Sequence, residues 1–216
     1  DDLYYNTDES TMEDIRYDMI KDTLIQRDKD YKPPVGAKLR ETDNRVKLPY
    51  WLGSADKITP EEPDTLKRWL EKNPAPNFMI SDKLDGVSCL FVHKDNTTHL
   101  YKRGDKHGDG ADISYLIPYL NLPNLTENIA VRGELVMKKS TFEKKYKGTY
   151  KNPRNMVSGL TGAKTAREGL EDIDFVAYEI VADTMYKQSK QFSKLEKIGF
   201  KVVRNISIEN LDMSIL

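Results

Sequence analysis

Short apolar runs bounded by turn residues dominate the middle of the chain and predict β-strands. The runs are rich in β-branched and aromatic residues, as in Cys89-Leu90-Phe91-Val92, and they are too short for buried helices. Asp95-Asn96 lies between two of them and predicts a hairpin turn, because both residue types tolerate a left-handed backbone. The strands are expected at residues 77–82, 87–93, 98–103, 129–137, 174–181 and 200–208.

Helical periodicity is confined to fewer segments. From Ser10 to Asp30, a polar cap, acids in the first turn and apolar residues at helical spacing predict an amphipathic helix. Further helices are expected at 60–72, 141–146, 154–159 and 187–198. Strands outnumber helices, so the sequence predicts an α+β fold with mostly antiparallel sheets.

Prolines and glycine interrupt the pattern between residues 31 and 50. This segment carries Pro33-Pro34, Gly36 and Pro49, which predicts an extended connector between two subdomains. The chain has 216 residues, of which 38% are hydrophobic, so it can bury one core and a small appendage.

Charge gives no overall basic signature, because 32% charged residues sum to a formal net charge of −1. Any contact with nucleic acid must therefore come from a local patch. A run of basic residues more often marks a solvated helix than a nucleic-acid contact. One candidate patch, interleaved with aromatic residues, consists of Lys138, Lys139, Lys144, Lys145, Lys147, Lys151 and Arg154.

Cysteine and histidine usage narrows the chemistry. Cys89 is the single cysteine, so neither a disulfide nor a cysteine zinc site is expected within the chain. His93, His99 and His107 lack metal-ligand spacing, and we expect no metal ligands among them. No apolar stretch is long enough to span a bilayer and no signal peptide is recognised, so we expect a soluble, cytoplasmic protein without a membrane partner.

The segment Lys83-Leu84-Asp85-Gly86 carries the strongest chemical signal. Strand side chains alternate, so an acid two residues after a lysine places an amine and a carboxylate on one face of a strand end. Lysine attacks phosphorus only when its ammonium group is deprotonated, which requires desolvation or neighbouring cations. Taken alone, this motif more often marks a strand-end lysine that faces water.

Further blocks follow in order. Arg103-Gly104-Asp105 opens a predicted loop that runs through Gly108 and Gly110 to Asp112-Ile113, Val131-Arg132-Gly133-Glu134 lies in an apolar strand, and Asn152-Pro153-Arg154-Asn155 precedes Ser158-Gly159. In this order they resemble the adenylation domain of NAD-dependent DNA ligases, a branch of the covalent nucleotidyltransferases. The resemblance runs from about Leu3 to the C-terminus. It implies a nucleotidyltransferase core, similar to the ATP-grasp fold, and a small N-terminal helical subdomain.

The resemblance implies a reaction in three steps, with NAD and Mg²⁺ as cofactors. Lys83 attacks the α-phosphate of NAD, expels nicotinamide mononucleotide and becomes lysyl-AMP, while Asp85 positions or activates the lysine. AMP then passes to a 5′-phosphate of nicked double-stranded DNA. The neighbouring 3′-hydroxyl displaces AMP and seals the nick, as replication and repair of damaged DNA require.

Binding roles are also carried over by the resemblance. Arg103 contacts the nucleotide, Glu134 the ribose hydroxyls, Tyr178 the adenine, and Ser54 lies on a loop that closes against the adenine. Arg154, on a loop fixed by Pro153 and the flanking asparagines, contacts the phosphate at the nick, and Lys151 contributes to DNA binding. By composition alone, Tyr178 reads equally as a core aromatic and Glu134 as a surface acid paired with a lysine.

The N-terminal segment argues for NAD over ATP. Asp14, Tyr17 and Asp18 project from one helix face, which alone reads as a solvated edge. Together with Tyr4 and Tyr5 they fit the family pattern that grips the nicotinamide mononucleotide half of NAD, since aromatic rings stack on a cationic pyridinium and carboxylates favour its charge. The family often has histidine where this chain has Tyr5.

The chain also departs from the family pattern. Ser81 replaces a glutamate, and Gly162 replaces a second arginine for which Lys164 or Arg167 can substitute. The chain ends before an Asp-Gly-Val-Val segment and a phosphate-contacting lysine, so we expect a fragment, or a subunit whose partner polypeptide carries these motifs, from a bacterium or from a virus or phage. The expected division is a nicotinamide mononucleotide-binding subdomain at 1–34, a connector at 35–50 and the core at 51–216.

Two other functions stay open at this stage. An ATP-dependent ligase or a capping-type guanylyltransferase shares the Lys-x-Asp-Gly core, although the Tyr4-to-Asp18 pattern and the Asn-Pro-Arg-Asn block speak against it. A non-catalytic DNA-binding subunit derived from a ligase would keep the fold without the chemistry.

Overall fold

A computed structural model gives the architecture of the chain. It describes residues 14–28, 30, 45–54, 58, 63–104, 108–163, 166–181, 186–209 and 211. Tyr4 and Tyr5 lie outside these residues. Asp14, Tyr17 and Asp18 belong to a described helix, but their side chains lie outside the described part.

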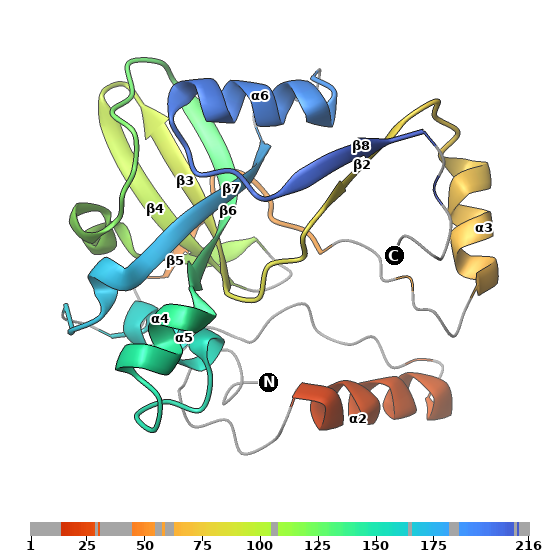
Figure 1. The fold of residues 1–216 in the computed structure, drawn as a ribbon, viewed down its shortest axis with the longest axis horizontal. Helices are drawn as coiled ribbons and strands as arrows, with labels where there is room; N and C mark the ends of the chain where they lie inside the picture. The colour runs from red at the N-terminus through yellow and green to blue at the C-terminus, as the bar shows by residue number, and fades with distance from the viewer. Residues whose placement is uncertain are drawn as a thin grey trace.

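Two antiparallel sheets organise the described residues (Figure 1). The larger has six strands in the order β1-β5-β4-β3-β6-β7, and the smaller pairs β2 with β8. The strands are β1 (Arg45–Lys47), β2 (Phe78–Ser81), β3 (Val87–Lys94), β4 (Thr97–Arg103), β5 (Asp109–Asp112), β6 (Ile129–Met137), β7 (Ile173–Ile180) and β8 (Asn205–Ile208).

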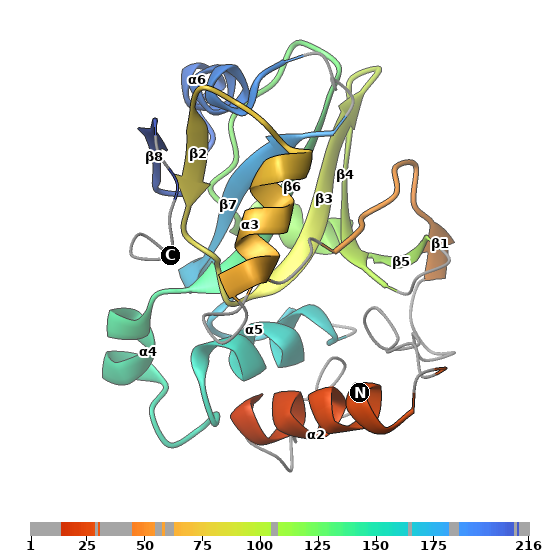
Figure 2. The ribbon, with the colours of Figure 1, turned by 90° about the vertical axis from the view of Figure 1, so that its right-hand side faces the viewer.

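Helices flank the larger sheet. In Figure 2 helix α5 lies below the ends of the central strands, and α6 packs on β7. The helices are α2 (Asp14–Arg27), α3 (Pro63–Lys72), α4 (Lys139–Lys145), α5 (Pro153–Thr161) and α6 (Gln188–Ile198), with 3-10 turns at Ser114–Tyr119 and Leu170–Asp172. No helix of the described residues is both long enough and apolar enough to cross a membrane.

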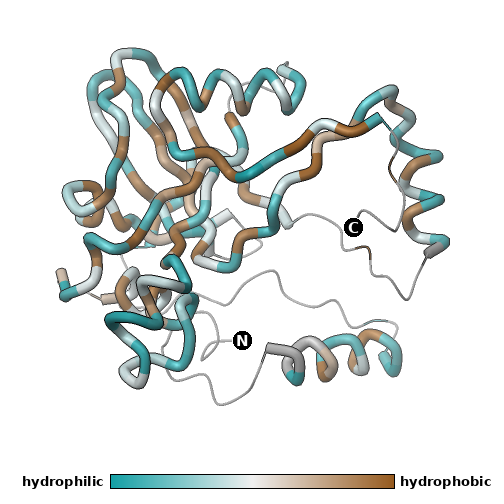
Figure 3. Tube along the Cα trace, in the orientation of Figure 1, coloured by the Kyte–Doolittle hydropathy of each residue, from teal (hydrophilic) through white to brown (hydrophobic). Residues whose placement is uncertain are grey.

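The main core lies on one face of the larger sheet. Alternate residues of β3 and β6, such as Phe91, Val131 and Leu135, point into it and are almost fully buried, together with Met156 of α5. The tube coloured by hydropathy shows hydrophobic residues recurring along these strands (Figure 3). The strands were predicted from these short apolar runs.

The opposite face carries two smaller apolar clusters. Leu48 and Leu52 pack on the β3 and β6 side, and Phe192 of α6 packs near Val176 of β7. Between the clusters the same face presents polar residues, which form a polar strip. They include Ser88 of β3 and Arg132 and Glu134 of β6. The polar strip between the two clusters is where the candidate site forms.

The structure confirms most predicted elements. The prediction of a strand at residues 129–137 matches β6 at both ends, and all pairs between the named strands are antiparallel. Asp95 and Asn96 form the predicted hairpin turn, with φ of 50° and 60°. Helix α6 ends at Gly199, whose φ of 101° is left-handed, as a C-terminal glycine cap requires.

Other predictions were wrong. The predicted loop after Arg103 contains strand β5, and the end of the expected connector is strand β1, which pairs with β5. Strands β1 and β5 are both short and polar, so no apolar alternation marks them in the sequence. Pairing with a distant segment decides their structure. Residues 200–204 are not a strand apart from one bridge at Val202, because β8 begins at Asn205.

Two local predictions at the site were also wrong. Lys83 and Asp85 do not stand at a strand end but in the loop between β2 and β3, because β2 ends at Ser81. The placement of Arg154 on a loop was wrong, whereas the helix expected at 154–159 is confirmed. Arg154 lies in the first turn of α5, because the Asn152 side chain caps this helix and Pro153 occupies its first position.

Candidate active site

The loop that carries Lys83 and Asp85 is fixed on both sides. Before it, Arg204 donates two hydrogen bonds of 3.0 Å to the carboxylate of Asp82. After it, Gly86 lies so close to β6 that a Cβ atom there would stand 2.1 Å from the carbonyl oxygen of Leu135 and 3.0 Å from Cγ of Glu134. Only glycine allows this approach, which brings the loop beside Glu134.

Helix α5 reaches the same loop through Arg154. Its Nη1 atom lies 2.7 Å from Oδ1 of Asp85, although the two residues are 69 positions apart. The first turn of α5 is held by Asn152, whose side chain accepts a 2.8 Å hydrogen bond from the backbone N–H of Asn155. The arginine predicted to contact DNA therefore lies next to the acid of the lysine motif.

Glu134 is the electrostatic centre of the site. Burial raises its pKa from 4.5 to about 7, because desolvation disfavours the charged carboxylate. Nearby positive charges act in the opposite sense but do not cancel the effect of burial. These charges belong to Arg154, Arg103, Lys83 and Arg132.

A β-bulge brings Tyr178 to this face. The register between β6 and β7 pairs Arg132 with Glu179 and Gly133 with Ala177, so Tyr178 is the extra residue. Its hydroxyl lies 3.2 Å from that of Ser88, and burial raises its pKa to about 12, helped by the negative charge of Glu134.

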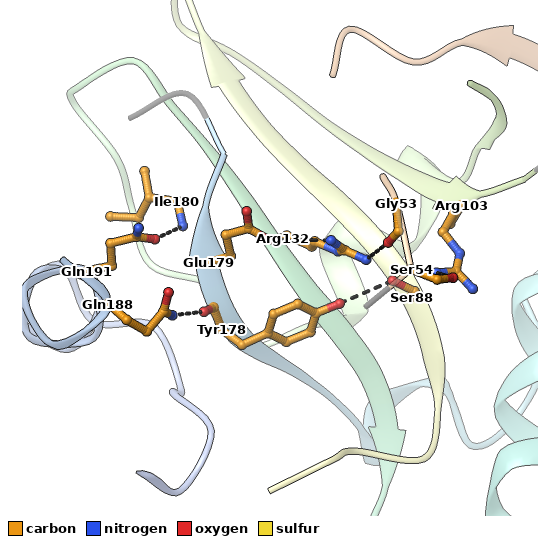
Figure 4. A network of polar contacts seen from close by, with 10 residues as sticks. All are labelled: Gly53, Ser54, Ser88, Arg103, Arg132, Tyr178, Glu179, Ile180, Gln188 and Gln191. Carbon is orange, nitrogen blue, oxygen red and sulfur yellow. Dashed lines mark hydrogen bonds and ion pairs between the residues drawn. The ribbon is translucent and has the colours of Figure 1, made fainter. Parts of the chain in front are cut away.

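Ser54 reaches the site from the loop after β1. Arg103 Nη1 donates to the Ser54 hydroxyl oxygen at 3.4 Å, and Arg132 donates to the carbonyl oxygen of Gly53 (Figure 4). Most of the predicted site residues therefore gather on one face of the sheet. They are Lys83, Asp85, Ser54, Arg103, Glu134, Tyr178 and Arg154, while Lys151 lies exposed in the bend before α5.

Sequence reasoning missed Arg132 and Ser88 as site residues. Arg132 stands two residues before Glu134 on the same strand, so the alternation of strand side chains was a signal that could have found it. Ser88 pairs with Glu134 across the strands, and only the register reveals this.

Two buried donors lack partners, and no acidic or histidine cluster suggests a metal site, in the part of the chain that the structure describes. Within the described residues, Nε of Arg132 and Nδ2 of Asn155 are buried and have no hydrogen-bond partner. Buried polar groups are normally paired, so these two donors are exceptions among the described residues. In the same part of the chain, no group of three or more His, Cys, Asp or Glu residues is placed to hold a metal ion.

The basic patch is partly neutralised by its own neighbours. Lys145 lies 2.8 Å from Asp172, and Lys147 lies 2.8 Å from Glu143. Tyr146 also donates to Asp172, and the hydrogen bonds from Lys145 and Tyr146 lower the pKa of that carboxyl. The charges of Lys145 and Lys147 are thus paired with neighbouring acids.

Comparisons with known proteins identify the family. Residues 62–215 match the NAD-dependent DNA ligase adenylation domain. A DNA ligase of Acanthamoeba polyphaga mimivirus is 38% identical over 99% of this chain and 34% of its own length. A putative DNA ligase of Invertebrate iridescent virus 6 is 33% identical over 95% of this chain and 34% of its own.

A bacterial relative extends the match. A DNA ligase of Wolbachia pipientis is 25% identical over 95% of this chain and 34% of its own length. The chain spans about a third of the length of these curated relatives. By the match over residues 62–215 and the identity to the viral proteins, the chain belongs to the NAD-dependent DNA ligase adenylation-domain family.

Proposed function

We propose that Lys83 of this adenylation domain accepts AMP from NAD, and that the whole ligase then passes the AMP to a DNA 5′-phosphate and seals the nick. The observation that carries this proposal is the convergence of Lys83, Arg103, Arg154 and Glu134 at one end of the polar strip. Three cations beside one half-buried carboxyl form a site suited to a phosphate and a ribose.

The adenylation step uses the amine of Lys83 as nucleophile. The free amine forms a bond to the α-phosphorus of NAD, and the bond from that phosphorus to the oxygen bridging to nicotinamide mononucleotide breaks. The departing mononucleotide carries the electron pair, and the amine loses a proton to solvent. The charges of Arg103 and Arg154 both act on Glu134, so both guanidinium groups lie near the proposed place of the phosphate. From there they can stabilise the negative charge that develops on the phosphate.

The ring of Tyr178 and the loop of Ser54 provide the adenosine side of the site. Tyr178 faces the polar strip rather than the main core, and Arg103 ties Ser54 to the same region. Glu134, from its central place, can bond the ribose hydroxyls. These placements support the roles predicted for the three residues.

Selection of NAD is proposed for the N-terminal segment. Tyr4, Tyr5, Asp14, Tyr17 and Asp18 would hold the nicotinamide mononucleotide half. Their segment corresponds to the proposed subdomain at 1–34. The family match supports use of NAD.

Metal, DNA and location complete the proposal. Mg²⁺ usually binds through substrate phosphates and one or two carboxylates, so Glu134 is the described acid best placed to assist it. Nicked duplex DNA would approach Arg154 and Lys151, and a second polypeptide can carry further ligase motifs. The relatives are viral and bacterial ligases, which supports action in the cytoplasm of a bacterium or of an infected host.

Transfer of label from NAD tests the proposal. The protein is incubated with Mg²⁺ and with NAD or ATP labelled in the adenylate phosphate, separated on a denaturing gel and digested for mass spectrometry. We expect label from NAD on Lys83 and none in Lys83→Arg, with Lys94→Arg at the exposed end of β3 as the matched control. Adduct on another residue, or labelling by ATP alone, would refute the assignment.

A further inference from the structure

One side chain joins the two adenosine-facing parts of the polar strip. Arg132 of β6 donates through Nη2 to the carbonyl oxygen of Gly53 and through Nη1, at 3.4 Å, to Glu179 of β7. Its guanidinium carbon also lies 5.6 Å from the centre of the Tyr178 ring. Figure 4 shows Arg132 lying beside the Tyr178 ring and reaching Gly53, next to Ser54.

Two leucines seat the described part of the loop on the sheet. Leu48 and Leu52 anchor it in the smaller apolar cluster, whereas Ser54 at its end is exposed. The ring of Trp51 lies on Gly53, because a Cβ atom at Gly53 would stand 2.1 Å from that ring. Gly53 therefore lies against the ring of Trp51 and accepts a hydrogen bond from Arg132.

The bulge in β7 is what allows this arrangement. Because Tyr178 is an extra residue in the ladder, Tyr178 and Glu179 both contact Arg132, although successive strand residues normally point to opposite faces. A planar guanidinium presents its donors in a rigid fork and stacks on an aromatic face, whereas the ammonium of lysine is a single point charge without that geometry. The site thus needs arginine rather than any cation.

We propose that Arg132 is a positioning residue that locks the Ser54 loop and the Tyr178 ring into one arrangement for the adenosine half of the nucleotide. This inference rests on the proposed function. A purely structural tie would be served as well by apolar residues, because a guanidinium that is only 18% exposed is costly to desolvate. Its Nε donor, moreover, stays unpartnered among the described residues.

The first test follows the loop and needs no nucleotide. The chain has two tryptophans, so a Trp69→Phe background leaves Trp51 as the single fluorescent reporter beside Gly53. The Trp51 ring is already largely exposed, so its mobility rather than its accessibility reports on the loop. In that background we expect Arg132→Met to lower the fluorescence anisotropy of Trp51. Arg204→Met removes another arginine that pairs with an acid, Asp82, outside the β1–β5 pair that leads into the loop, and should leave the Trp51 anisotropy unchanged.

The second test measures the nucleotide. In adenylation of Lys83, Arg132→Met should raise KM for NAD about tenfold and change kcat by less than about threefold, because the lost charged hydrogen bonds orient the adenosine and not the reacting phosphate. The KM of Arg132→Lys for NAD should lie between those of the wild type and Arg132→Met. Equilibrium binding of AMP should weaken by the same factor as KM rises.

The outcomes separate this inference from the proposed function. Absence of label on Lys83 in the wild type defeats the proposed function, whereas the Trp51 measurement still decides whether Arg132 holds the loop. Unchanged Trp51 anisotropy in Arg132→Met overturns the inference, and so does a mobile Trp51 with unchanged AMP affinity. If Arg132→Met fails to fold, as circular dichroism would show, Arg132→Lys and Glu179→Gln give the same two readings.

Discussion

Replacing Glu134 by glutamine should change how the stability of the protein depends on pH. Burial raises the pKa of Glu134 from 4.5 to about 7 in the folded protein, whereas the unfolded chain keeps the ordinary value. Between these values the folded state holds a proton that the unfolded state has released. Stability contributed by this group is therefore fully present below the lower pKa and is lost as pH rises through the higher one.

The pKa difference sets the size of the effect. It corresponds to about 3 kcal/mol of unfolding free energy, of which about 2.5 kcal/mol is lost between roughly pH 5 and pH 8. Glutamine has nearly the same shape and does not titrate, so Glu134→Gln should lose that much less over the same interval. Other titrating groups are common to both proteins and cancel in the comparison.

Urea unfolding at several pH values measures this difference. Glu143→Gln is the matched control, because Glu143 is an exposed acid whose contact is an ordinary helical pair with Lys147. Its pH curve should follow the wild type. If the unfolding free energies of wild type and Glu134→Gln change in parallel with pH, the reasoning is refuted. If the wild type instead loses stability relative to Glu134→Gln toward low pH, the effect of Glu134 has the opposite sign.

Three further changes test other parts of the fold and site. Gly86→Ala should cost about 3 kcal/mol in urea unfolding because its methyl group meets backbone, whereas Gly148→Ala, in open space but at a φ of 90°, should cost about 1 kcal/mol; equal losses would contradict the close approach. Tyr146→Phe removes the hydrogen bond to Asp172 and should cost about 1 kcal/mol by the same measurement, which an unchanged midpoint would disprove. Lys151→Ala should reduce the salt slope of nicked-duplex binding by about one, and an unchanged slope would place the DNA elsewhere.

Local sequence determined the elements whose side chains alternate strongly. Residues 129–137 read as a strand because apolar residues that face the core recur along them, and the structure agrees at both ends. Asp95-Asn96 predicted its turn because the preference for a left-handed backbone is intrinsic to these residues. The order of the Lys83, Arg103, Glu134 and Arg154 blocks indicated the family, since covalent chemistry on a phosphate constrains residue types along the chain.

Tertiary structure decided everything that depends on pairing between distant segments. The Arg45 and Asp109 strands, 64 positions apart, exist because they pair with each other, and neither carries an apolar pattern of its own. Arg154 meets Asp85 over 69 positions, and Arg132 meets Gly53 over 79. Side-chain periodicity reports only which face of its own element a residue occupies, so these contacts required the register of the sheet and the bulge in β7.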